Sequence, residues 1–107
     1  MNLMLSVTFP SPKGDDVGKA FIDLLQANPM PEYVKLTEYY QSWGGDGFIG
    51  HVFYNLDDAN IPDALRYITN LTWEMTKKVE GWRVLNQDVV SSLAEAYEYL
   101  GTASPAV

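Results

Sequence analysis

The sequence predicts one α+β domain built on an antiparallel sheet, and three observations support this. The chain has 107 residues, the usual size of a single domain. Its apolar residues recur at every second position in some segments, as in strands, and three or four positions apart in others, as in helices. These segments follow one another as strand, helix, strand, strand, helix, strand, helix. With 47% hydrophobic residues the chain can form a core, so disorder is not expected.

The first strand and the first helix are separated by a proline-rich break. Apolar and polar residues alternate from Leu3 to Phe9, which is typical of a half-buried strand. Pro10-Ser11-Pro12 ends this strand. From Asp15 to Ala27 the apolar positions are three and four residues apart, and two acids stand at the N-terminal end, where they favour a helix.

A hairpin is the clearest local prediction. Residues 33–43 and 48–54 are rich in aromatic and β-branched residues, and Gly44-Gly45-Asp46-Gly47 separates them. Such glycines tolerate the positive φ angles of tight reversals. The turn residues are Gly45-Asp46, Asp46-Gly47 or all four; each choice gives a loop of even length and the same division of side chains between faces.

The second half of the chain repeats the change from helix to strand. Asn60 and Pro62 are typical of a helix start, and the apolar stripe that follows predicts a helix from Ile61 to Val79. Residues 82–90 are expected to form the fourth strand. The spacing of Ser92 and Glu95 predicts a capping box and a short last helix over 92–100. We therefore expect one domain over residues 1–101 and a frayed tail over 102–107.

Strict alternation assigns the hairpin side chains to two faces, and neither face is polar throughout. One face would carry Val34, Leu36, Glu38, Tyr40, Ser42, Ile49, His51, Phe53 and Asn55. The other would carry Tyr33, Lys35, Thr37, Tyr39, Gln41, Trp43, Phe48, Gly50, Val52 and Tyr54. Two helices cover only one face of a four-stranded sheet, so a second copy of the chain is the simplest cover for the other. The alternative cover is the last helix, folded back across the sheet.

The order of elements corresponds to a ferredoxin-like βαββαβ arrangement, with a four-stranded antiparallel sheet and an extra C-terminal helix. From Leu3 to Val90 the order and length of these elements resemble the dimeric α+β barrel superfamily, in which two ferredoxin-like subunits pack their sheets around a cavity. The resemblance implies a homodimer. That superfamily includes antibiotic-biosynthesis monooxygenases, polyketide cyclases, haem-degrading enzymes and many members of unknown function, so the fold does not transfer a function. The haem-degrading branch uses a histidine on a helix, whereas His51 lies on a predicted strand, and no cofactor is expected.

His51, Tyr40 and Glu38 are the candidate catalytic residues. His51 is the only histidine, and its side chain is the only one here whose ordinary pKa lies near neutrality. On one sheet face, with Glu38 orienting it and Tyr40 as hydrogen-bond donor, it would serve as general base in a cofactor-free monooxygenase or cyclase. The alternative is a histidine whose polar atoms are satisfied within the sheet or in a dimer interface.

Aromatic residues crowd the hairpin and are the candidate ligand-binding residues: Trp43, Phe53, Tyr39, Tyr54 and Phe48. Aromatic walls with a few hydroxyls suit a small apolar or aromatic ligand, which we expect in a cavity between the sheets. The same residues suit packing within the core or between chains. The function is therefore either small-ligand binding, catalysis through His51, or that of a non-catalytic interaction module.

Composition excludes several classes of partner and site. With 7 Lys plus Arg against 14 Asp plus Glu, the formal net charge is −7, which is the wrong sign for binding nucleic acid or anionic lipid. There is no cysteine, so no disulfide, thiolate nucleophile or cysteine-ligated metal is possible. Asp15-Asp16 and Asp57-Asp58 lack the spaced ligands of a calcium loop, and no metal is expected. No signal peptide or membrane span is predicted, and the expected location is the cytoplasm.

Overall fold

A computed structural model of the chain describes residues 1–44, 46–103 and 105. The strands are β1 (Asn2–Phe9), β2 (Val34–Gly44), β3 (Gly47–Leu56) and β4 (Arg83–Val90). They form one antiparallel sheet in the order β2-β3-β1-β4. The helices are α1 (Gly14–Ala27), α2 (Ile61–Lys78) and α3 (Leu93–Tyr99). The α+β class and the antiparallel sheet are confirmed, and the arrangement is compatible with a ferredoxin-like fold.

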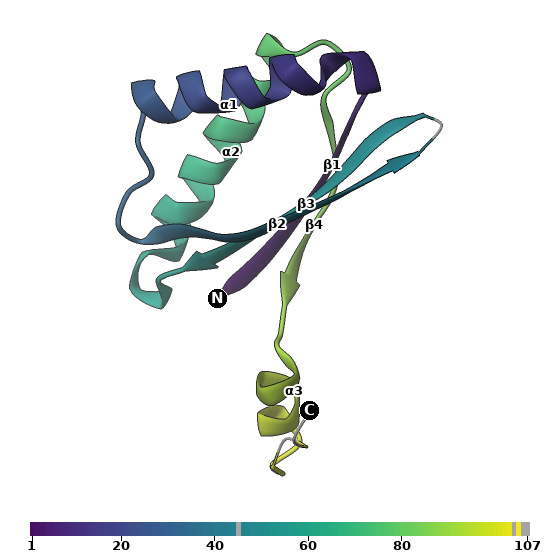
Figure 1. The fold of residues 1–107 in the computed structure, drawn as a ribbon. Helices are drawn as coiled ribbons and strands as arrows, with labels where there is room; N and C mark the ends of the chain where they lie inside the picture. Colours follow the sequence, from purple (N-terminus) through teal and green to yellow (C-terminus); the bar gives the residue numbers. More distant parts are fainter. Residues whose placement is uncertain (45, 104, 106–107) are drawn as a thin grey trace.

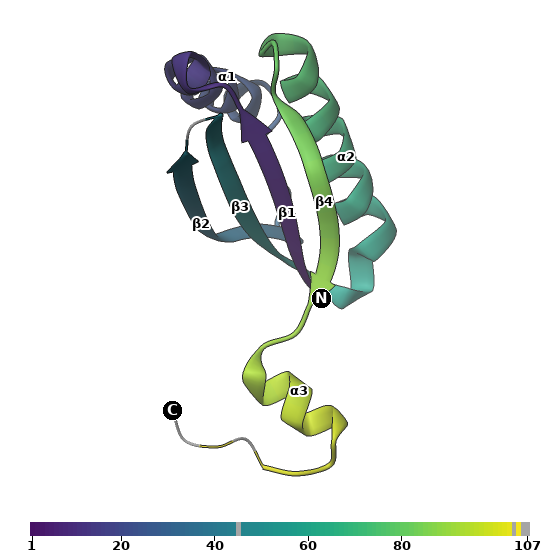
Figure 2. The same cartoon turned by 90° about the vertical axis from the view of Figure 1, so that its right-hand side faces the viewer.

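Helices α1 and α2 lie on the same face of the sheet (Figure 1). The core forms between them and β1, where Leu3, Leu5, Val7 and Phe9 are each 4% exposed or less. Their alternation along the strand directs all four to the face that the helices cover. We call this the covered face and the opposite one the open face. Figure 2 views the sheet from its open side, with α2 behind β4 and α1 above the strands.

A bulge in β2 corrects the face assignment made from strict alternation. Leu36 pairs with Tyr54, and Glu38 pairs with the residue directly before Tyr54 in β3. Thr37 has no partner between them and is therefore an extra residue in the ladder. One extra residue reverses the faces of everything on one side of it. Val34 and Leu36 therefore lie on the covered face with Tyr39, and not on the face that carries Glu38.

Helix α3 projects beyond the end of β4, away from the rest of the domain (Figures 1 and 2). Its predicted capping box is present, because the Ser92 side chain accepts from the Glu95 backbone and the Glu95 carboxylate accepts from the Ser92 backbone. The helix does not fold back across the sheet. Residues 104, 106 and 107 of the predicted tail, and Gly45 of the predicted turn, lie outside the described residues.

Candidate functional site

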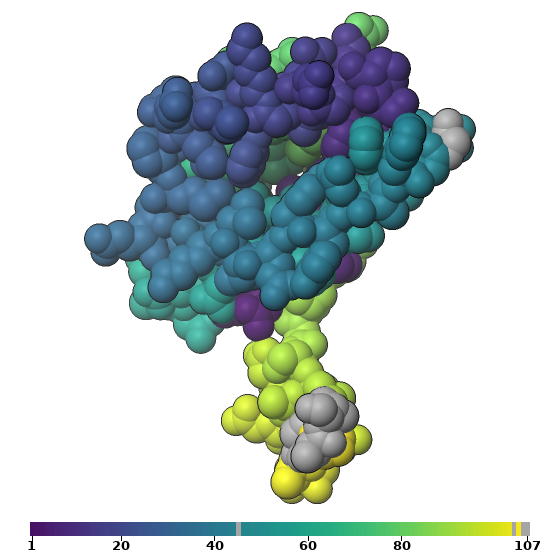
Figure 3. Space-filling model, viewed as in Figure 1, coloured from purple at the N-terminus to yellow at the C-terminus, as the bar shows by residue number. Residues whose placement is uncertain are grey.

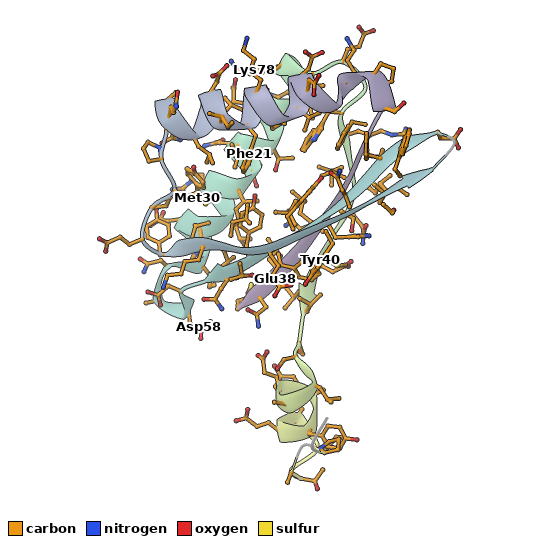
Figure 4. All side chains as sticks on the ribbon, viewed as in Figure 1. Phe21, Met30, Glu38, Tyr40, Asp58 and Lys78 are labelled. Atoms are coloured by element: carbon orange, nitrogen blue, oxygen red, sulfur yellow. The ribbon has the colours of Figure 1, made fainter. Side chains whose placement is uncertain are left out.

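The predicted catalytic residues lie on the open face, in the middle of the sheet. Residues that face one another across the four strands form a row of Tyr40, His51, Ser6 and Asn86. The next row contains Glu38 and Phe53. Figure 4 shows Glu38 and Tyr40 on the side of the sheet away from α1. The structure therefore brings the three predicted residues into two neighbouring rows.

The histidine has a partner that the sequence did not indicate. His51 Nδ1 lies 2.8 Å from the hydroxyl of Ser6, which is 3% exposed. Glu38 acts instead on Tyr40, where a hydrogen bond from the phenol and the carboxylate charge raise the pKa of Tyr40. The expected pairing of Glu38 with His51 is not formed. Ser6 could not have been found from periodicity alone, because the alignment of β1 with β3 is not a local property of either strand.

The pockets described for residues 1–44, 46–103 and 105 do not reach the predicted catalytic residues. Neither of the two described pockets is lined by His51, Tyr40 or Glu38, and Tyr40 is 60% exposed. General base catalysis requires a substrate held within hydrogen-bond distance of the base. The two rows supply groups for such chemistry, but neither described pocket adjoins them to hold a substrate.

The larger pocket lies on the other side of the sheet, between the covered face, α1 and α2. This α1–sheet cleft has a volume of about 580 Å³. Its inner wall includes Leu5, Val7, Leu71 and Met75, and α1 contributes Val17, Gly18 and Phe21. Figure 3 shows a hollow between α1 and the β2–β3 hairpin, and Figure 4 shows Phe21 directed from α1 toward the sheet. The cleft is lined from three sides, by α1, by α2 and by the covered face of the sheet.

The structure divides the predicted ligand-binding residues between the two faces. Tyr39, Phe48 and Tyr54 line the cleft. Trp43 does not line it, but its ring stacks on that of Phe48 with 5.8 Å between centroids. Phe53 lies on the open face, edge-on to Tyr40 at 6.2 Å. The cleft is thus formed within one chain, between its sheet and its helices, whereas the expected cavity lay between two sheets.

Two glycines shape the cleft. A Cβ at Gly18, on α1, would meet no atom within 4 Å, so this position faces open space. A Cβ at Gly50, on β3, would lie 2.6 Å from the Tyr39 hydroxyl, so this glycine makes room for the tyrosine ring. Glycine inside a helix lowers its stability. The aromatic pattern gave no reason to single out Gly18, although it lines the cleft.

The phenols that line the cleft are held in their neutral form. Burial raises the pKa of Tyr54 well above its ordinary value, and the nearby Tyr67 adds to this effect. Burial also raises the pKa of Tyr39, whose hydroxyl donates a 2.8 Å hydrogen bond to Gln41. At neutral pH both phenols keep their protons, and that of Tyr39 is already donated to Gln41.

Other kinds of site receive no support from the described part of the chain. Within residues 1–44, 46–103 and 105, no three His, Asp or Glu side chains gather in a way that could hold a metal ion. In the same residues, no helix has the length and apolar character needed to span a membrane. Comparisons of the chain with models of protein families, with curated proteins and with solved structures find no match. The function must therefore be argued from the geometry of the site.

Proposed function

We propose that the protein binds a small apolar or aromatic ligand in the α1–sheet cleft. One observation carries this proposal: the cleft is about 580 Å³ in volume and has an apolar inner wall. Pockets that bind small molecules typically measure roughly 300–1,000 Å³ and have such walls. Each CH₂ group of a ligand that moves from water onto this wall contributes about 0.8 kcal/mol.

The proposal extends to a homodimer in which the open faces of two copies pack together. Ile49 is 41% exposed on this face, and Met4 and Phe53 are only half-buried. A sheet face that meets water is usually polar, and the resemblance to dimeric α+β barrels supports the same partner. In such a dimer the cleft stays open, because it lies on the opposite side of each sheet.

Catalysis through His51 is a second candidate, and the 2.8 Å contact with Ser6 favours it. Ser6 orients the imidazole, and dimer packing would enclose the row that contains Tyr40. A cofactor-free proton abstraction then requires His51, so His51→Ala should abolish turnover and leave the dimer intact. Unchanged turnover would exclude this role.

Titration with N-phenyl-1-naphthylamine, a neutral dye that fluoresces in apolar surroundings, tests binding in the cleft. We expect saturable binding to the wild-type protein and at least about tenfold weaker binding to Gly18→Leu, whose side chain would occupy the cleft. Gly18→Ala adds one methyl group and should bind nearly as well as the wild type.

A control on the open face separates the two surfaces. Ile49→Ser removes an exposed apolar group from that face and should leave dye binding unchanged. Loss of binding in Ile49→Ser but not in Gly18→Leu would place the dye on the open face and contradict the proposal. A function as an interaction module without a ligand would be supported if no dye or ligand binds at all.

A further inference from the structure

Among the described residues, one charged residue lines the cleft, and it is an acid. Asp15, in the first turn of α1, lines the cleft, whereas none of the lining residues is Lys, Arg or His. The chain as a whole carries a formal net charge of −7. An anionic ligand would therefore enter against a negative potential and find no cation to pair with. Removing a carboxylate or sulfonate from water without such a partner is strongly unfavourable.

The inner wall holds a hydroxyl that is free to bond a ligand. Tyr54 is 3% exposed and lines the cleft. None of the described residues forms a hydrogen bond with the Tyr54 hydroxyl. Among these residues, every fully enclosed side-chain N or O atom has a hydrogen-bond partner, so the unpartnered Tyr54 hydroxyl is not fully enclosed. The Tyr54 hydroxyl therefore keeps access to open space. A ligand acceptor that reaches this hydroxyl can bond it without displacing a protein partner.

The mouth of the cleft differs from its inner wall. Tyr39 is 44% exposed and lies over Gly50, with its hydroxyl bonded to Gln41. This aromatic edge can stack against a ring that enters between α1 and β2. The Tyr39 hydroxyl already donates to Gln41. The mouth therefore contributes ring contact with a ligand, and the hydrogen bond to the ligand comes from Tyr54 on the inner wall.

We infer that the cleft selects uncharged, ring-bearing molecules with a hydrogen-bond acceptor, such as an aryl ketone, and rejects their anionic analogues. This inference rests on the proposed function, since it names the ligand class of the same cleft. Tyr54 donates to the acceptor, the apolar wall holds the ring, and Asp15 excludes anions.

Two dyes with the same ring system test the charge selectivity. N-phenyl-1-naphthylamine is neutral, and 8-anilino-1-naphthalenesulfonate adds a sulfonate. We expect the neutral dye to bind at least about tenfold more tightly at low ionic strength. Asp15→Asn should strengthen sulfonate binding roughly two- to fivefold and leave the neutral dye unchanged. Asp16→Asn is the matched control, because Asp16 pairs with Lys13 at 3.9 Å and does not line the cleft.

A second pair of probes tests the hydrogen bond. 2-Acetylnaphthalene and 2-ethylnaphthalene have similar shapes, but only the first carries an acceptor. Displacement of the neutral dye gives the affinity of each probe. The ratio of the affinity for the ketone to that for 2-ethylnaphthalene should be about fivefold higher in the wild-type protein than in Tyr54→Phe. Equal preference in the two proteins would overturn the role of Tyr54.

The outcomes separate this inference from the proposed function. If the neutral dye binds and Gly18→Leu does not alter its affinity, the cleft is not the binding site and the proposed function fails. If Gly18→Leu blocks the neutral dye but the sulfonate binds the wild type as tightly, the cleft binds ligands without charge selectivity. In that case only the present inference is overturned.

Discussion

Gly18 lines the cleft and Gly50 lies beneath Tyr39, another lining residue, yet the same added methyl group should have different effects at the two glycines. Gly18 lies inside α1 and faces open space, so Gly18→Ala should raise the free energy of unfolding by about 0.5–1 kcal/mol. Gly50→Ala should give no such gain, because the Tyr39 ring must move and its bond to Gln41 is lost. Urea denaturation measures both. A stability loss in Gly18→Ala would show that this position is filled.

Tyr54 should make the fold sensitive to high pH. Burial raises its folded-state pKa above the ordinary value of 10.0, so the stability it contributes is complete below about 10. That stability is lost as the pH rises above the unfolded-state pKa. Urea midpoints measured at increasing pH should fall less steeply in Tyr54→Phe than in the wild type. Tyr99→Phe, which alters a 75% exposed phenol on α3, is the control. Equal slopes for Tyr54→Phe and the wild type would contradict the account.

At the scale of elements, the bulge in β2 predicts which deletion the sheet tolerates. Thr37 has no pairing partner in β3, so deleting it closes the ladder without moving any other residue to the opposite face. We expect the deletion to cost about 1 kcal/mol or less. Deleting Lys35 instead would displace Val34, which is 3% exposed, and should cost roughly 2–4 kcal/mol. Thermal unfolding compares them, and equal losses would show that Thr37 is not the extra residue.

Periodicity predicted which elements form, but it could not predict how they meet. The apolar spacing of α1 and α2, the alternation in β1 and the glycine turn all act locally, and each of these elements is present. The bulge at Thr37 depends on pairing with β3, and the Ser6–His51 contact depends on the register of two strands far apart in sequence. Both are decided by packing over the whole domain, so local pattern could not reveal them.

The cleft illustrates the same limit for the candidate site. Aromatic composition drew attention to Tyr39, Phe48 and Tyr54, which line the cleft, but placed them in a cavity between two sheets. It gave no indication of how α1, α2 and the sheet would pack against one another. For the α1 residues that line the cleft, the sequence pattern predicts a helix and no binding role.

At the scale of the whole molecule, the proposed dimer predicts the effect of charges on the open face. Ile49→Lys combined with Phe53→Lys would place unpaired charges between the two sheets and should weaken dimerisation by roughly 100-fold or more. Ile22→Lys, at a 56% exposed position on α1, is the matched control and should leave the dimer intact. Sedimentation equilibrium measures each mass. A wild-type monomer at micromolar concentration would remove the basis of the dimer.

Ligand binding in the α1–sheet cleft is the central claim, and methyl NMR of the four methionines tests it most directly. Met75 lines the cleft and is 3% exposed, whereas Met4 lies in the same open-face row as Phe53. With ¹³C-methyl methionine in the protein, saturating N-phenyl-1-naphthylamine should shift the Met75 signal and leave the Met4 signal in place. A shift of Met4 with Met75 unchanged would locate the ligand on the open face and contradict the claim.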